Sequence, residues 1–250
     1  MGFLVFLIGA VLGSFYLVLG KRLPKNEDVV KSRSHCDNCG HELSWWELIP
    51  VVSYIILGGK CHKCKKRIDP LHFLMEIVTG GLFLLGYLYF GFGYEMFMFM
   101  IISSLLVLIY VTDFTYFIIL DSPLIGATIL STILFLVYKT PKELLIHFIS
   151  GVALFLAMLL IKFIGDKLFK RESLGGGDIK FAFVMGYILG FRLGLIALII
   201  STFLALPYCM ASLLIKKNNE VPYGPFLVSS LFLIFLFMDK FVMLLELINS

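Results

Sequence analysis

Long apolar runs separated by short polar segments organise the whole chain. The runs cover residues 2–20, 73–90, 96–112, 123–137, 144–164, 179–191, 193–215 and 226–245. Most are close to the length of about 20 residues that an α-helix needs to cross a bilayer, and the run at 179–191 is short. The pattern therefore predicts an all-α polytopic membrane protein with about eight transmembrane helices.

The composition argues against a soluble protein. Of the 250 residues, 60% are hydrophobic and 15% are charged, whereas soluble domains are about 45–50% apolar and about 25% charged. The lysines and arginines flank the apolar runs and form no separate basic face, so a nucleic-acid partner is not expected. The lipid bilayer is the expected surrounding, and the sequence leaves the oligomeric state open.

One long polar stretch, residues 21–72, follows the first apolar run and is rich in lysine and arginine. Under the positive-inside rule this stretch is cytoplasmic and the amino terminus lies outside. The first run lacks the basic start and the cleavage site of a secretory signal, so we interpret it as a membrane helix. The predicted parts are a first helix at 1–20, an inserted cytoplasmic domain at 21–72 and a transmembrane catalytic domain at 73–250.

Four of the five cysteines form two C-x-x-C pairs in this polar stretch: Cys36, Cys39, Cys61 and Cys64. Paired motifs at this separation suit tetrahedral coordination by four thiolates, and reduced thiols agree with a cytoplasmic location. We predict a structural zinc site, because four thiolates leave no position for water; a redox pair or an iron–sulfur cluster is the rival interpretation. Three neighbouring histidines are not needed as ligands: His35, His41 and His62.

Two aspartates lie at the ends of apolar runs, where a carboxylate costs about 2.5–3.5 kcal/mol on insertion scales and is a candidate for function. Asp113 ends one run and Asp178 follows three glycines, and the eight-span topology puts both at the cytoplasmic boundary. Two carboxylates about 3 Å apart share a proton and so supply a base and an acid for hydrolysing a peptide bond. The structural alternative is that each aspartate caps a helix.

The glycines Gly175, Gly176 and Gly177 offer a side-chain-free approach to Asp178, on which an extended substrate backbone could lie. Glu76, early in the second apolar run, is an intramembrane acid without an obvious local partner. Two interpretations are open for Glu76: it pairs with a basic residue of the polar stretch, or it contacts the substrate.

Both tryptophans, Trp45 and Trp46, lie between the two cysteine pairs. They either lie at the membrane interface, where indole rings are favoured, or form the small core of the polar stretch. A further acid, Asp121, precedes Ser122-Pro123 and fits the N-cap of a helix with proline in its first turn.

Several stretches together resemble the bacterial type IV prepilin peptidases, which are leader peptidase/N-methyltransferases of the GxGD aspartic protease group. The resemblance covers nearly the whole chain, including the four cysteines, Asp113 at the place of the first catalytic aspartate, and Gly175-Gly176-Gly177-Asp178 as the GxGD motif. The other matching stretches are Gly13-Ser14-Phe15, Glu47 to Tyr54, Pro70 to Glu76, and Val221-Pro222-Tyr223-Gly224-Pro225-Phe226.

The resemblance implies an enzyme of the bacterial inner membrane that cleaves the basic leader of prepilins or pseudopilins on the cytoplasmic side, after a glycine. It also implies methylation of the new amino terminus with S-adenosylmethionine. Asp113 and Asp178 would be catalytic, Gly175 and Gly177 would shape the substrate approach, and the four cysteines would hold zinc. The alternatives are a non-catalytic assembly factor that docks pilin-like helices, and a transporter that uses intramembrane acids.

Overall fold

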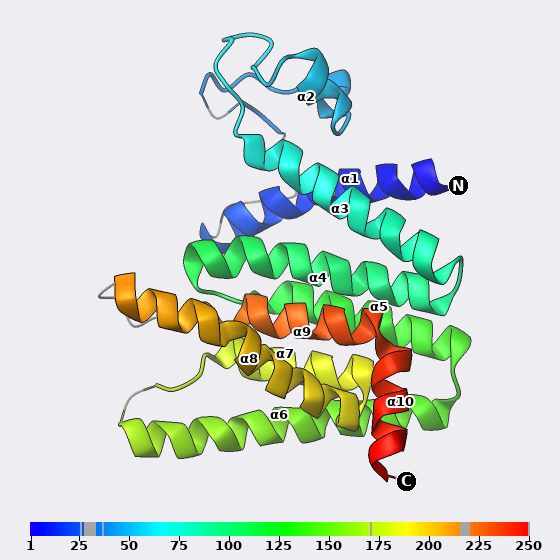
Figure 1. Ribbon diagram of the computed structural model, residues 1–250. Coiled ribbons are helices and arrows are strands. Elements are labelled where there is room, and N and C mark those ends of the chain that lie inside the picture. Colours follow the sequence, from blue (N-terminus) through cyan, green and yellow to red (C-terminus); the bar gives the residue numbers. More distant parts are fainter. Residues whose placement is uncertain (26, 28–33, 37, 171, 216–220, 250) are drawn as a thin grey trace. The chain divides into compact units, whose positions relative to one another are not determined.

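Helices make up most of the computed structural model, which describes residues 1–25, 27, 34–36, 38–170, 172–215 and 221–249 (Figure 1). Among these residues there is no β-strand, and the only β-structure is two isolated bridges. The described chain forms two units, residues 1–96 and 97–250. The predicted all-α class is confirmed. Residues 216–220, between the predicted runs at 193–215 and 226–245, lie outside the described residues.

In the first unit, helices α1 (Gly2–Arg22) and α3 (Pro70–Phe90) pack closely against each other (Figure 1). The close approach requires glycine at position 13, because a Cβ there would lie 2.5 Å from the Met75 carbonyl oxygen of α3. The charged ends of the two helices are also joined. Lys21 Nζ lies 2.9 Å from Asp69 Oδ2, and Asp69 caps α3 by accepting the Leu71 N–H.

In the described residues of the polar segment between these helices, the elements are short: η1 (Leu23–Lys25), η2 (Trp45–Leu48) and α2 (Val52–Ile56). The two tryptophans have different surroundings. Trp46 packs edge-on against His62 with ring centres 5.3 Å apart, whereas Trp45 is 78% exposed. Trp46 is thus half-buried and packs on the exposed His62, and the location of the two tryptophans at a membrane interface or in a small core stays a prediction.

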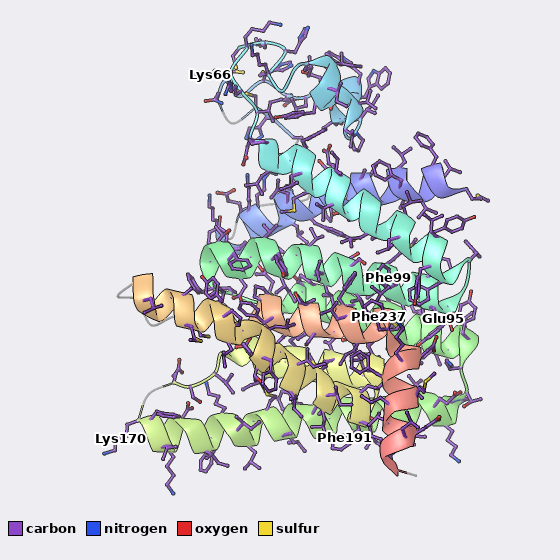
Figure 2. The ribbon with its side chains drawn as sticks, viewed as in Figure 1. Lys66, Glu95, Phe99, Lys170, Phe191 and Phe237 are labelled. Atoms are coloured by element: carbon purple, nitrogen blue, oxygen red, sulfur yellow. The ribbon has the colours of Figure 1, made fainter. Side chains whose placement is uncertain are left out.

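The second unit is a helical bundle. Its helices are α4 (Tyr94–Tyr116, which begins in the first unit), α5 (Asp121–Tyr138), α6 (Pro141–Phe169), α7 (Gly176–Leu189), α8 (Phe191–Ile215), α9 (Gly224–Leu236) and α10 (Met238–Asn249). Helix α7 lies among α5, α6, α8 and α9, and most of its side chains are buried. It begins at the same end of the bundle as Lys170 and ends beside Phe191 at the other end (Figure 2).

Three helices of this bundle, α7, α9 and α10, are too short to cross a bilayer alone. At about 1.5 Å per residue, the 14 residues of α7 and the 13 of α9 extend only about 20 Å, against a hydrocarbon thickness of about 30 Å. Among the described residues, six helices are long and apolar enough to span, and the bent pair α9–α10 could form a seventh. The predicted multi-pass architecture is confirmed, with α7 as the run that is too short by itself.

The predicted run at 226–245 is not one straight helix. The chain bends by 80° between α9 and α10, at Phe237 (Figure 2). The polar residues Asp239 and Lys240 directly follow the break, and Lys240 Nζ lies 5.3 Å from the centre of the Phe237 ring. These polar residues interrupt the apolar run, which is a physical reason for the helix to end there.

Glu76 connects three motifs of the first unit. It is 8% exposed on α3, and its Oε2 accepts the Val51 N–H at 2.7 Å, with the Ser14 hydroxyl of α1 as a second partner. Val51 has φ 64° and ψ −50°, and the Val52 N–H donates to the Pro50 carbonyl oxygen at 2.6 Å. This is a γ-turn of the rare, strained kind. Glu76 thus holds a strained turn against the helix pair, and its predicted contact with substrate stays a prediction.

Replacing Glu76 by leucine should destabilise this unit, because the partly buried Val51 N–H would lose its hydrogen-bond partner. The expected loss is about 1–3 kcal/mol of unfolding free energy. Glu76→Gln retains an oxygen that can accept the same hydrogen bond and should lose less. Thermal unfolding of the full chain in detergent measures the difference, and equal stability of the leucine variant and the wild type would contradict this role.

Candidate active site and metal centre

Asp113 lies in the last turn of α4 and is 5% exposed. Its Oδ2 accepts the N–H of Gly224, the first residue of α9, at 2.9 Å. A Cβ at Gly224 would lie 2.9 Å from that same oxygen, so glycine is needed for this approach. The partly positive amino end of α9 therefore faces the Asp113 carboxylate. The other carboxylate oxygen is not engaged by this N–H.

Asp178 is the third residue of α7 and is half-buried. Its carboxylate accepts the N–H of Gly175, the N-cap residue of the same helix. An acid that reaches back to the N-cap N–H fixes its own side-chain direction, as in one half of a capping box. The structural alternative is thus partly correct: Asp178 does satisfy its helix end, and this contact also orients its carboxylate.

Ile119, in the loop after α4, brings the two helix starts together. A Cβ at Gly177 would lie 2.8 Å from Ile119 Cβ, and a Cβ at Gly224 would lie 2.8 Å from Ile119 Cδ1. The amino ends of α7 and α9 therefore pack on one side chain, and Asp113 is bonded to one of these ends while Asp178 belongs to the other. The two carboxylates are close enough for their charges to interact.

Two polar pairs tie neighbouring helices to this region. Lys180, two residues after Asp178, lies 2.8 and 2.7 Å from the two carboxylate oxygens of Asp121 and so links α7 to α5. The predicted N-cap role of Asp121 is wrong: the N-cap residue of α5 is Leu120, Asp121 is the first residue of the helix, and its carboxylate pairs with Lys180. The second pair links α8 to the N-cap residue of α9, because the Ser201 and Tyr223 hydroxyls lie 2.7 Å apart.

The four cysteine sulfur atoms lie within 4.8 Å of one another. Two of the separations are 3.9 Å (Cys36–Cys64) and 4.0 Å (Cys39–Cys61). Tetrahedral zinc with Zn–S bonds of about 2.3 Å requires sulfur atoms about 3.8 Å apart, so the cluster fits a four-thiolate site.

The two halves of the cluster have the same backbone arrangement. Gly40 N–H donates to the Cys36 carbonyl oxygen, and Lys65 N–H donates to the Cys61 carbonyl oxygen, at 2.9 and 3.0 Å. Gly40 and Lys65 each have positive φ, 68° and 59°, directly after the second cysteine of the pair. The backbone N–H groups of Cys64 and Lys63 act on the Cys61 sulfur and lower its pKa to about 6, against the opposing effect of burial. The fold thus favours a thiolate at Cys61.

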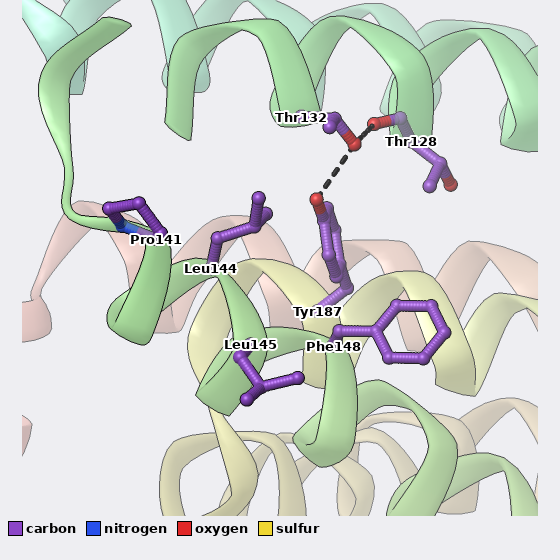
Figure 3. A pocket seen from close by; sticks show the side chains of 7 residues that line it. All are labelled: Thr128, Thr132, Pro141, Leu144, Leu145, Phe148 and Tyr187. Atoms are coloured by element: carbon purple, nitrogen blue, oxygen red, sulfur yellow. Dashed lines mark hydrogen bonds between the residues drawn. The ribbon is translucent and has the colours of Figure 1, made fainter. Parts of the chain in front are cut away.

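A pocket of about 580 Å³ occurs elsewhere in the second unit (Figure 3). Its polar part centres on the Thr132 hydroxyl, which donates to the Thr128 carbonyl oxygen and shares a hydrogen bond with the Tyr187 hydroxyl. The remaining lining is apolar: Pro141, Leu144, Leu145 and Phe148. Neither candidate aspartate lines this pocket, and its lining has no charged side chain, so we do not assign peptide hydrolysis to it.

Sequence reasoning missed two residues of the site, Gly224 as a hydrogen-bond donor and Ile119 as the common packing partner. The signal for Gly224 was present, because Pro225 is typical of the first turn of a helix and a glycine beside it leaves room for a neighbouring group to approach the backbone. Ile119 carried no signal, since one isoleucine among many cannot be distinguished by pattern. The site residues that were predicted lie at α4 and α7 in the second unit, while Glu76 lies in the first.

Comparison with known proteins gives two matches to family models. Residues 7–90 match the bacterial peptidase A24 N-terminal domain, and residues 100–210 match the type IV leader peptidase family. The first region includes the four cysteines and Glu76, and the second includes Asp113 and Asp178. No solved structure matches the chain.

Individual relatives carry one common name, prepilin leader peptidase/N-methyltransferase. The protein of Bacillus subtilis is 30% identical over 249 residues, covering 96% of this chain and 95% of its own length. That of Vibrio cholerae is 28% identical over 92% of this chain and 94% of its own, and that of Myxococcus xanthus is 31% identical over 75% and 56%. The resemblance predicted from the motifs is confirmed, and the chain belongs to the type IV leader peptidase family.

Proposed function

We propose that this protein is an aspartic endopeptidase that removes the leader of type IV prepilins or pseudopilins and then methylates the new amino terminus. The proposal rests on the junction around Ile119, where Asp113 and Asp178 come from helices far apart in the sequence. Membership in the leader peptidase family supports a peptidase at this junction. The aspartic mechanism and the cleavage position are our inference.

In the proposed reaction, water attacks the carbonyl carbon of the scissile bond. One carboxylate takes a proton from this water, and the other gives a proton or a hydrogen bond to the carbonyl oxygen. The Gly224 N–H and the Gly175 N–H each hold one carboxylate in place. These contacts reduce the motion that would separate the two acids, which favours catalysis by positioning.

The short helices suggest how a membrane-anchored substrate reaches the site. Because α7 and α9 extend only about 20 Å, their amino ends can lie below the level of the headgroups in a bilayer about 30 Å thick. A prepilin with a basic leader in the cytoplasm and an apolar helix in the bilayer would present its scissile bond at this depth. We propose that the leader end is cytoplasmic, that cleavage follows a glycine, and that the enzyme lies in the bacterial inner membrane with its amino terminus outside.

We propose further that Cys36, Cys39, Cys61 and Cys64 hold a structural zinc ion. Four thiolates leave no coordination position for water, so the metal would stabilise the fold and would not act on the substrate. Few of the segment's described residues are buried and apolar, and small segments of this kind commonly depend on a metal. Zinc would therefore determine whether this segment is folded.

Methylation requires a methyl donor, which we propose to be S-adenosylmethionine on the basis of the relatives' shared name. The pocket of Figure 3 offers no carboxylate for ribose hydroxyls, the group that commonly binds such nucleosides. We therefore assign no residues to the donor. A non-catalytic assembly factor that docks pilin-like helices is the alternative function, and it predicts binding of prepilin without cleavage.

Substituting either aspartate by asparagine should abolish processing while leaving the chain folded. We expect cleavage to fall by about 10²- to 10⁴-fold or more in Asp113→Asn and Asp178→Asn, because each removes one of the two acid–base groups. Mass spectrometry of a co-expressed prepilin measures this: the wild type should give a shortened pilin that carries one additional methyl group.

The exposed Asp239→Asn change at the start of α10 is the matched control and should process prepilin normally. Retained cleavage in either purified active-site variant would remove that aspartate from the mechanism. Prepilin that copurifies uncleaved with the wild type would support the assembly factor instead.

Purified protein should contain one zinc ion per chain, measured by elemental analysis. Cys61→Ser should lose most of this zinc and make the segment at 34–69 sensitive to protease, whereas Cys209→Ser should keep the metal. Iron with a visible absorption band would show that the cluster is an iron–sulfur site, and full occupancy in Cys61→Ser would show that the metal lies elsewhere.

A further inference from the structure

We propose that Lys162 is a positioning residue of the active site and acts through the peptide group between Leu174 and Gly175. The inference rests on the proposed function, because it assigns Lys162 the task of orienting Asp178. Lys162 lies on α6, sixteen residues before Asp178 in the sequence, and carried no functional signal in the sequence pattern.

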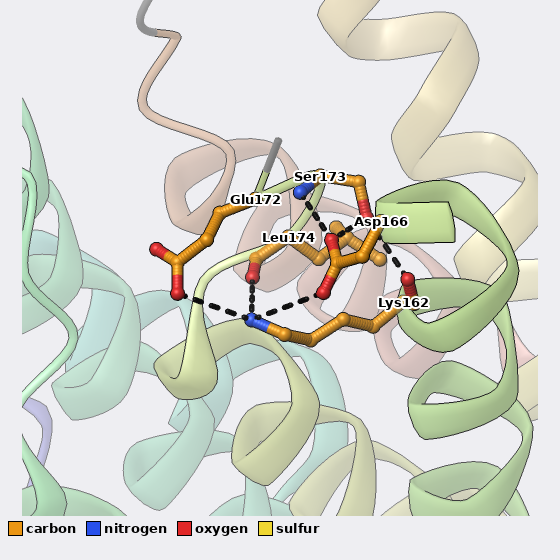
Figure 4. Close-up of polar contacts among 5 residues, drawn as sticks. All are labelled: Lys162, Asp166, Glu172, Ser173 and Leu174. Carbon is orange, nitrogen blue, oxygen red and sulfur yellow. Dashed lines mark hydrogen bonds and ion pairs between the residues drawn. The ribbon is translucent and has the colours of Figure 1, made fainter. Parts of the chain in front are cut away.

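The main partner of Lys162 is a carbonyl oxygen. Its Nζ donates to the Leu174 oxygen at 2.8 Å, and its side chain is 25% exposed (Figure 4). Two acids are further away, with Asp166 Oδ2 and Glu172 Oε1 both at 4.0 Å. A hydrogen bond from an ammonium group to a carbonyl is of the charge-assisted, stronger kind. Lys162 therefore holds the backbone directly before the glycine run.

The peptide group that Lys162 holds also contacts Asp178. Leu174 supplies its carbonyl and Gly175 its N–H. The Asp178 carboxylate lies against Gly175, where a Cβ would be 3.1 Å from Asp178 Oδ2, and takes the Gly175 N–H as its backbone partner. The described chain has no cis peptide bond, and in a planar trans peptide the C=O and N–H point in opposite directions. Fixing the oxygen therefore fixes the direction of the N–H, and with it the carboxylate. The ammonium also polarises the peptide and strengthens its N–H as a donor.

A second contact supports the same loop. Asp166 Oδ1 accepts both the N–H and the hydroxyl of Ser173, at 2.6 and 2.8 Å (Figure 4). Residues 173 and 174 are thus both held by side chains of α6, just before α7 begins. Glycine has no side chain with which to anchor a segment, so these two contacts from α6 restrict the chain directly before α7 begins.

The test compares kcat and KM of the purified full chain on a synthetic prepilin in detergent. Lys162→Met keeps the apolar stem but loses the donor, and we expect kcat to fall about 10- to 100-fold, the range for losing a charged hydrogen bond. KM should change by less than about threefold, because substrate binding is not the step affected. Lys162→Arg retains a donor and should recover most of kcat, and Lys167→Met, an exposed change on the same helix, should behave as the wild type.

A matched pair at Gly175 tests the path of the effect. Gly175 has φ −68°, which both alanine and proline adopt, and either residue adds a Cβ, but only proline removes the N–H. Adding Lys162→Met to Gly175→Pro should reduce kcat little further, because the proline variant already lacks the Gly175 N–H through which Lys162 acts on Asp178. Adding it to Gly175→Ala should reduce kcat as much as in the wild type.

Unchanged kcat in a folded Lys162→Met variant, or full additivity with Gly175→Pro, would overturn the inference. A rise in KM with unchanged kcat would also overturn the inference, because it would make Lys162 a substrate-binding residue. Thermal unfolding of each variant separates misfolding from mispositioning, and a folded Lys162→Arg with normal kcat supports the inference even where Lys162→Met unfolds. These outcomes are distinct from failure of the proposed function, in which Asp178→Asn itself would retain cleavage.

Discussion

The hydrogen bond from Gly224 to Asp113, together with the packing of Ile119 between two helix starts, is the interaction on which the site depends. It requires two helices to begin at one point, with glycine at Gly177 of α7 and Gly224 of α9, where a Cβ would collide with Ile119. A carboxylate in an apolar setting is costly, and backbone N–H groups at helix amino ends offset part of that cost. The backbone N–H groups that offset the cost of placing the two carboxylates in an apolar setting also hold these carboxylates in position.

Helices α7 and α9, with 14 and 13 residues, are shorter than α4, α5, α6 and α8 of the same bundle (Figure 1). Our proposal for the approach of a membrane-anchored substrate depends on this difference in length. Burial of α7 on several sides stabilises it despite its length. Side chains of α6 hold residues 173 and 174, directly before the glycine run.

Much of the architecture could be predicted from the sequence. Apolar run length identifies membrane helices well, and the four cysteines and both aspartates were singled out by residue type and setting. The bend at Phe237 was missed because hydropathy averages over the break and does not register a local polar pair such as Asp239 and Lys240. The partner of Glu76 could not be predicted either, because the Val51 N–H is a backbone group and leaves no trace in residue type.

The central claim is that Asp113 and Asp178 act on the same peptide bond. The most direct measurement is an experimental structure of the inactive Asp178→Asn variant with a prepilin peptide bound across the glycine run. The account predicts that the scissile bond lies between the two side chains, within hydrogen-bonding reach of both or of one water that they share. A scissile bond that reaches only one of these residues, with the other turned toward a different part of the bundle, would contradict it.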